Sequence, residues 1–242
     1  MIYFASDFHL GFPTYDKSRE RENKIISWLD TISVDATEIH LVGDVFDFWH
    51  EWKRVVPKYF VRFMAKTAEL VSRGIDVYFY VGNHDLWTYG YLEKELGWKV
   101  IRKPQVRVIG NKSFFIAHGD ETPYESRTFK VMKSVFKNRF AQWFYANVLH
   151  PDLSAALAIR FSSRRDRCEE KEPFLEENDY QIKYARDILK TGQVDFFVFG
   201  HRHVPYVYEL TPESKVIGLG DWLTEFTYAR YDGENVELLR WK

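Results

Sequence analysis

Five short motifs with metal-ligand chemistry occur in order along this chain of 242 residues. They are Asp7-Phe-His9, Gly43-Asp44-Val-Phe-Asp47, Gly82-Asn83-His84-Asp85, His118-Gly119 and Gly200-His201-Arg-His203. The candidate ligands are Asp7, His9, Asp44, Asn83, His118, His201 and His203, all O or N donors that suit Mn²⁺, Fe, Co²⁺ or Zn²⁺. Seven donors are too many for one ion that must leave positions open to water and substrate. We therefore predict a two-metal site with one shared carboxylate.

Each motif follows a short apolar run that is typical of a buried strand. The runs are Ile2–Ala5, Ile39–Val42, Val77–Val81, Phe114–Ala117 and Phe196–Phe199. In open α/β sheets, ligands bind at the carboxyl ends of strands. We expect these five strand ends to bring the seven donors around one cavity.

Taken singly, each motif also has a purely structural interpretation. An Asp-x-His can be a turn, a His-x-His can line one face of a strand, and Asn83 can be an ordinary turn residue. The five motifs together contain five of the eight histidines, which favours a site. For His40, His50 and His150 we expect positions in the core, in a loop or on the surface.

The rest of the chain first alternates strands with helices and then changes to hairpins, as in an α/β protein. Helices are predicted over Lys17–Thr31, Pro57–Ser72 and Tyr91–Leu96. Further strands are predicted over Val106–Ile109, Ser113–Ala117, Pro205–Leu210, Lys215–Leu219, Glu225–Tyr231 and Asn235–Trp241. The length suits one large α/β domain.

Residues 121–192 interrupt this order and are predicted to be an inserted helical cap. An apolar stripe recurs there at helical spacing, formed by Phe129, Met132, Phe136, Phe140, Trp143 and Phe144. Residues 127–167 hold nine Lys and Arg against two Asp and Glu, a net charge of +7 in a chain of −1. One interpretation is that the stripe belongs to a pair of helices that pack on their own domain and expose a basic face to solvent. The stripe can also bind an apolar anionic substrate, or lie on a membrane surface.

Other features are compatible with a reducing compartment and predict no membrane-spanning helix. The single cysteine, Cys168, cannot form an intrachain disulfide. Removal of a signal peptide would remove the first ligand motif, so none is expected. No apolar run approaches the roughly 18 residues of a membrane-spanning helix.

The ordered motifs resemble those of the calcineurin-like metallophosphoesterases over all but residues 121–192. The resemblance implies a two-sheet β-sandwich flanked by helices (αββα), with the core at 1–120 and 193–242 and the cap at 121–192. It implies Asp7, His9, Asp44 and His203 around a first metal, and Asp44, Asn83, His118 and His201 around a second. It also implies that His84 contacts the scissile phosphate and that Asp85 orients His84.

Within this family, the chain is most similar to the pyrophosphohydrolases of lipid A synthesis, through Asp7–Gly11, Gly43–Trp49, Leu219–Trp222 and the basic apolar insertion. These enzymes cleave UDP-2,3-diacylglucosamine to UMP and 2,3-diacylglucosamine 1-phosphate. The similarity implies Mn²⁺, acyl chains under the cap, a cytoplasmic location peripheral on the inner membrane face, and neither nucleic acid nor an obligate protein partner. The expected substrate residues are Arg127, Phe136, Phe140, Trp143, Arg160, Arg164 and Arg165.

The chain departs from the better-known members in two places. They carry Gly-Asn-Arg-Asp where this chain has His84, and they differ over Glu121–Ser126, where substrate recognition is expected. A phosphodiesterase or phosphatase that acts on a soluble nucleotide or phosphoprotein is therefore the alternative. A non-catalytic scaffold is a third possibility, but it would lack ligands, and here none is missing. The Phe and Trp stripe favours the lipid substrate.

Overall fold

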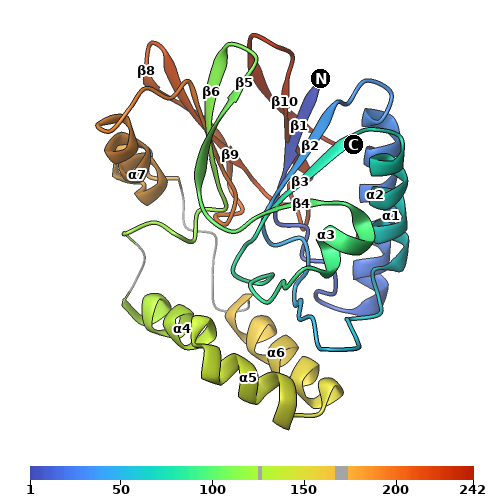
Figure 1. The fold of residues 1–242 in the computed structure, drawn as a ribbon. Helices are drawn as coiled ribbons and strands as arrows, with labels where there is room; N and C mark the ends of the chain where they lie inside the picture. Colours follow the sequence, from blue (N-terminus) through green and yellow to red (C-terminus); the bar gives the residue numbers. More distant parts are fainter. Residues whose placement is uncertain (125–126, 167–173) are drawn as a thin grey trace.

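The structure, a computed structural model, describes residues 1–124, 127–166 and 174–242 and consists of two mixed β-sheets packed face to face (Figure 1). The first sheet has the order β11-β10-β1-β2-β3-β4. Its parallel strands are β1 (Ile2–Ala5), β2 (Glu38–Val42), β3 (Asp76–Tyr80) and β4 (Lys99–Ile101). β10 (Thr227–Tyr231) and β11 (Val236–Arg240) extend it in antiparallel pairing.

The second sheet has the order β5-β6-β7-β9-β8. β6 (Lys112–Ala117), β7 (Phe196–Phe199) and β9 (Ser214–Leu219) run parallel, with β5 (Gln105–Ile109) and β8 (Pro205–Thr211) antiparallel at the edges. Apolar side chains from both sheets meet in one buried layer, where the Phe4 and Phe114 rings stack with centroids 5.7 Å apart. Burial of both faces explains why these strands read as continuous apolar runs.

Helices cover the outer face of each sheet. α1 (Tyr15–Ile32), α2 (Val61–Ser72) and α3 (Tyr91–Leu96) pack on the first sheet through residues such as Trp28, Phe63 and Leu92. α7 (Tyr180–Leu189) packs on the second sheet through Ile182 and Ala185, and the 3₁₀ turn η1 (Glu176–Asn178) precedes it. The predicted two-sheet sandwich flanked by helices is confirmed.

The predicted insertion contains two kinds of helix. α4 (Arg127–Lys137), α5 (Arg139–Val148) and α6 (Pro151–Asp166) lie together away from the sheets, below the ends of the parallel strands, and are here called the cap helices (Figure 1). α7, by contrast, is part of the layer that covers the second sheet. Within the described residues, no helix is both long enough and apolar enough to cross a membrane.

The apolar stripe of the insertion does not form one continuous helix. Asn138 stops α4 and caps α5, because its side-chain oxygen accepts the backbone N–H groups of Phe140 and Ala141 at 2.9 and 3.0 Å. The first and last parts of the stripe therefore lie on two helices. The side chains of Arg127, Arg164 and Arg165 lie outside the described part of the structure, and so does Cys168.

Candidate metal centre

The seven predicted ligands lie in loops that follow five parallel strands. Asp7 and His9 follow β1, Asp44 follows β2 and Asn83 follows β3. From the second sheet, His118 follows β6, and His201 and His203 follow β7. Backbone hydrogen bonds join the loops, from Asp7 N to Gly43 O at 3.1 Å and from Gly200 N to His118 O at 2.9 Å. The backbone N–H of His201 also donates to Asp7 Oδ2 at 3.0 Å, so loops from the strand ends of both sheets meet at one place.

The backbone at these positions adopts a conformation that L-amino acids rarely occupy. Only seven non-glycine residues have a positive φ among those described, and five of them are predicted ligands: Asp7 (56°), His9 (43°), Asp44 (50°), His201 (70°) and His203 (58°). Such backbone costs roughly 1–3 kcal/mol per residue and clusters at functional sites. This concentration of strain therefore supports a functional role for the loops.

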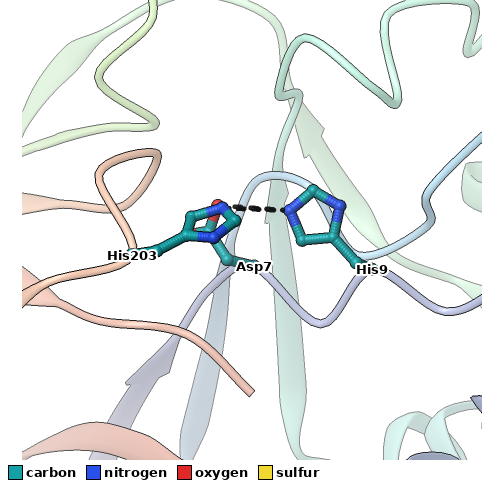
Figure 2. Close-up of side chains that lie close together, drawn as sticks. All are labelled: Asp7, His9 and His203. Carbon is teal, nitrogen blue, oxygen red and sulfur yellow. Dashed lines mark hydrogen bonds and ion pairs between the residues drawn. The ribbon is translucent and has the colours of Figure 1, made fainter. Parts of the chain in front are cut away.

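One cluster of donors is formed by Asp7, His9 and His203 (Figure 2). The Nε2 atoms of His9 and His203 lie 3.2 Å apart, and Asp7 Oδ1 lies 3.2 Å from His203 Nε2 and 3.7 Å from His9 Nε2. Three donor atoms that converge at these distances are arranged as ligands of one cation.

A second cluster is formed by Asp44, His118 and His201. Asp44 Oδ2 lies 3.2 Å from His118 Nε2 and 3.9 Å from His9 Nε2, so its carboxylate lies between this cluster and the first. The Nδ1 atom of His118 lies 2.9 Å from the backbone oxygen of Val42, which fixes the proton on Nδ1 and leaves Nε2 as the acceptor. Among the described residues, the Asp44 carboxylate therefore lies near histidines of both clusters.

Two glycines allow these side chains to approach so closely. A Cβ atom at Gly43 would collide with the His118 ring, and a Cβ atom at Gly82 would collide with the Asp44 carboxylate. Any larger residue at either position would push a predicted ligand out of place. Both glycines are thus required by the packing of the ligands, and Gly43 also by its backbone, whose φ is +82°.

Polar atoms of the two clusters are buried without hydrogen-bond partners among the described residues. They include Asp7 Oδ1 and His118 Nε2, and Oδ1 of the predicted ligand Asn83 is buried without a partner as well. Burial alone would raise the pKa of the Asp44 carboxyl, but its electrostatic interactions with His118 and His84 more than offset this effect and hold the pKa well below its usual range. An anionic, buried set of O and N donors with free lone pairs fits divalent cations.

His84 lies beside the clusters and is held by a different residue from the one predicted. Its Nδ1 donates to the backbone oxygen of Asp47 at 2.7 Å, and its Nε2 lies 4.0 Å from Asp44 Oδ2. Asp85 was expected to orient this ring. Its carboxylate instead accepts the N–H groups of Val45 and Phe46 at 2.9 and 3.0 Å, which fixes the loop that carries Asp44.

Several supporting residues were missed by the sequence analysis. Asp47 Oδ1 lies 3.5 Å from His9 Nδ1, and Asp221 Oδ2 lies 3.8 Å from His203 Nδ1. The buried Arg21 of α1 donates to the backbone oxygen of His9 at 2.6 Å. Gln181 of α7 donates to the backbone oxygen of Gly200 at 2.8 Å. Asp47 and Asp221 both lie in motifs that the sequence analysis singles out, and these positions are the local signals that could have indicated a supporting role.

The predicted substrate residues lie on the cap helices, and the structure does not place them among the ligands. Phe140 and Trp143 are 71% and 56% exposed, Phe136 is 39% exposed, and Arg160 is exposed. The cap meets the ligand loops at Lys133, which forms an ion pair with the buried Asp120 two residues after His118. Beside this contact lies a cavity of about 110 Å³ lined by Gly82, Leu86, Arg102, Lys133 and Lys137, among others.

Comparison with known proteins agrees with this geometry. Residues 1–205 match the family of calcineurin-like phosphoesterases. The chain is 37% identical to UDP-2,3-diacylglucosamine hydrolase of Porphyromonas gingivalis, over 98% of this chain and 96% of that protein. It is 26% identical to the protein of the same name from Actinobacillus succinogenes, over 91% of each. A dimetal phosphatase structure from Danio rerio aligns with a TM-score of 0.48 at 12% identity, over 100% of this chain and 98% of that one. This chain therefore belongs to the calcineurin-like phosphoesterase family and is a metal-dependent hydrolase.

Proposed function

We propose that this protein hydrolyses the pyrophosphate of UDP-2,3-diacylglucosamine at a two-metal centre, giving UMP and 2,3-diacylglucosamine 1-phosphate. The observation that carries the proposal is the position of Asp44 between two groups of histidines, next to cap helices with exposed aromatic side chains. The curated relatives that bear this substrate in their names match nearly the whole chain, including the cap.

Asp7, His9, Asp44 and His203 would hold one ion, and Asp44, Asn83, His118 and His201 the other. The donors suit Mn²⁺, which we propose as the metal. When bound, the two ions activate water and offset negative charge on the phosphoryl oxygens. His84 faces the same space through Nε2 and would contact the phosphate under attack. A phosphate leaving group needs little further protonation.

The cap helices would recognise the lipid. Phe136, Phe140 and Trp143 expose enough apolar surface to cover acyl carbons, each buried CH₂ contributing roughly 0.8 kcal/mol. Arg127, Arg160, Arg164 and Arg165 would hold the phosphates or the sugar, and Arg side chains suit bidentate contacts. The same basic and apolar helices would place the protein peripherally on the cytoplasmic face of an anionic membrane.

Purified protein reconstituted with Mn²⁺ tests the proposal. Mass spectrometry of the reaction with UDP-2,3-diacylglucosamine should detect UMP and 2,3-diacylglucosamine 1-phosphate, and water labelled with ¹⁸O should appear in one product only. Bis(p-nitrophenyl) phosphate is the parallel substrate that has no lipid. Turnover of the diester without turnover of the lipid would reject the proposal in favour of a soluble phosphodiester substrate.

A further inference from the structure

Two segments of the core run side by side from the candidate metal centre toward the cap. The backbone N–H of Trp49 donates to the oxygen of His84 at 3.3 Å, and the N–H of Glu51 donates to the oxygen of Trp87 at 3.2 Å. His50 and Trp87 form an isolated parallel bridge between these hydrogen bonds. Backbone hydrogen bonds therefore connect residues 49–51 with residues 84–87, and Trp87 lies at the end of this pairing that is farther from His84.

The Trp87 side chain contacts the junction between α4 and α5, here called the α4–α5 corner, which is formed by Phe136, Asn138 and Tyr145. Its indole N–H donates to the backbone oxygen of Phe136 at 3.0 Å, and its ring packs edge-on against the Phe136 ring at 5.8 Å. The Tyr145 ring of α5 lies 4.6 Å away. One side chain thus contacts both helices at the point where Asn138 separates them.

His50 completes this junction from the core side. It is fully buried, with its ring 5.1 Å from Trp87 and 5.4 Å from Tyr145. Both of its ring nitrogens lack hydrogen-bond partners in the part of the chain that the structure describes. His50 therefore contributes to this contact by aromatic packing, beside the hydrogen bond of Trp87.

The Trp87 contact also fixes the cavity beside the metal centre. Lys133 and Lys137 of α4 line this cavity together with Gly82. Lys137 directly follows Phe136, whose backbone oxygen accepts the hydrogen bond from Trp87. Lys133 is fixed independently by its ion pair with Asp120. The position of Lys137 over the cavity thus depends on the docking of the α4–α5 corner.

We propose that Trp87 is a positioning residue that docks the cap and so selects substrates with a second phosphate next to the one attacked. This rests on the proposed function and adds the residue that sets its specificity. Docking brings the Lys137 ammonium to a cavity next to the candidate ligands, where a second phosphate of a pyrophosphate would be held. A simple diester has no such group and gains nothing from the docking.

The test compares Trp87→Phe and Trp87→Ala with Trp241→Phe as the matched control, since Trp241 packs on the first sheet away from the cap. Trp87→Phe removes one hydrogen bond but keeps a ring. It should raise KM for UDP-2,3-diacylglucosamine about tenfold, as expected for one lost contact of this kind. Trp87→Ala should raise it further. Neither variant should change kcat/KM for bis(p-nitrophenyl) phosphate or the Mn²⁺ content.

Hydrogen exchange gives a readout that does not depend on activity. In both Trp87 variants, amides of residues 131–148 should exchange faster, whereas those of β1, β2 and β3 should not. Unchanged exchange in the cap, or equal losses on both substrates, would overturn the inference. If the wild-type protein fails to cleave the lipid substrate, the proposed function fails, while the exchange result still decides whether Trp87 docks the cap.

Discussion

The ligand loops and the cap helices are held in opposite ways. Asp7, Asp44 and His118 are fully buried, and their loops are fixed by hydrogen bonds and by residues from several elements. The cap helices leave large apolar side chains exposed and meet the core at Lys133 and at the Trp87 junction. Catalytic geometry requires donors fixed within a fraction of an ångström, whereas a lipid site needs a surface that adapts.

This difference predicts that mutations in the two regions act on different steps. Changes in the ligand loops should affect metal binding and turnover with every substrate. Changes in the cap should affect only substrates that reach it. The following experiments test this separation.

The largest effect is expected for Asp44→Ala. Asp44 is the carboxylate between both groups of histidines, so its loss leaves two cation sites without a shared anion. Activity on both substrates should be abolished, and mass spectrometry should show less than two equivalents of bound metal. Asp30→Ala, at an exposed acid on α1, is the control. Normal turnover with both metals retained would contradict the dimetal assignment.

His84→Ala should reduce turnover without removing metal. His84 is held by the backbone oxygen of Asp47 and lies further from Asp44 than His118 does. Residues that stabilise charge or transfer protons contribute roughly 10²–10⁴ in rate, and kcat should fall by this factor on both substrates. His150→Ala, at an exposed histidine, is the control. Because His84 also lies near His9 and Asp44, loss of a metal ion would instead make it a ligand.

The double variant Phe140→Asp, Trp143→Asp should affect the lipid substrate alone. Both side chains are exposed on α5, and Phe136 is left intact because it packs against Trp87. Loss of contact with several CH₂ groups, roughly 2–3 kcal/mol, should lower kcat/KM for the lipid about a hundredfold. Hydrolysis of the diester should not change. Val34→Asp on the core is the control, and equal losses on both substrates would mean that these residues support the core.

The smallest effect is expected at the junction itself and appears as a pH dependence of stability. Burial lowers the pKa of His50 from 6.5 to about 4. The folded state therefore favours the neutral ring of His50. Above pH 6.5 the ring is neutral in the folded and the unfolded protein, and the free energy of unfolding is highest. As the pH falls from 6.5 toward 4, the unfolded protein takes up a proton and the free energy of unfolding decreases. The full loss of stability between pH 6.5 and pH 4 amounts to roughly 3 kcal/mol.

The measurement is the melting temperature at pH 7 and pH 5. The wild-type protein should lose several degrees more than His50→Phe, which keeps the ring and removes the titration. His150→Phe should behave as the wild type does. An equal decrease in melting temperature in the wild type and in His50→Phe would show that protonation of His50 does not affect stability.

Much of the fold could be predicted because its signals are local. β1 and β7 were predicted with the observed bounds, since continuous apolar runs that end in Asp or Gly identify buried parallel strands. α7 was not separated from the cap, because its amphipathic pattern is the same whether a helix covers a sheet or lies apart. The break at Asn138 was also missed, although Asn is a preferred N-cap residue.

The sequence by itself determined which atoms can act: seven O and N donors, each placed at a strand end by its own neighbours. It also determined the family, because the ordered motifs are specific. Only the tertiary structure decided that the Asp47 backbone rather than Asp85 holds His84, and that Trp87 reaches the cap. These contacts join segments 37 to 49 residues apart, and no local pattern encodes which side chains will meet across such a distance.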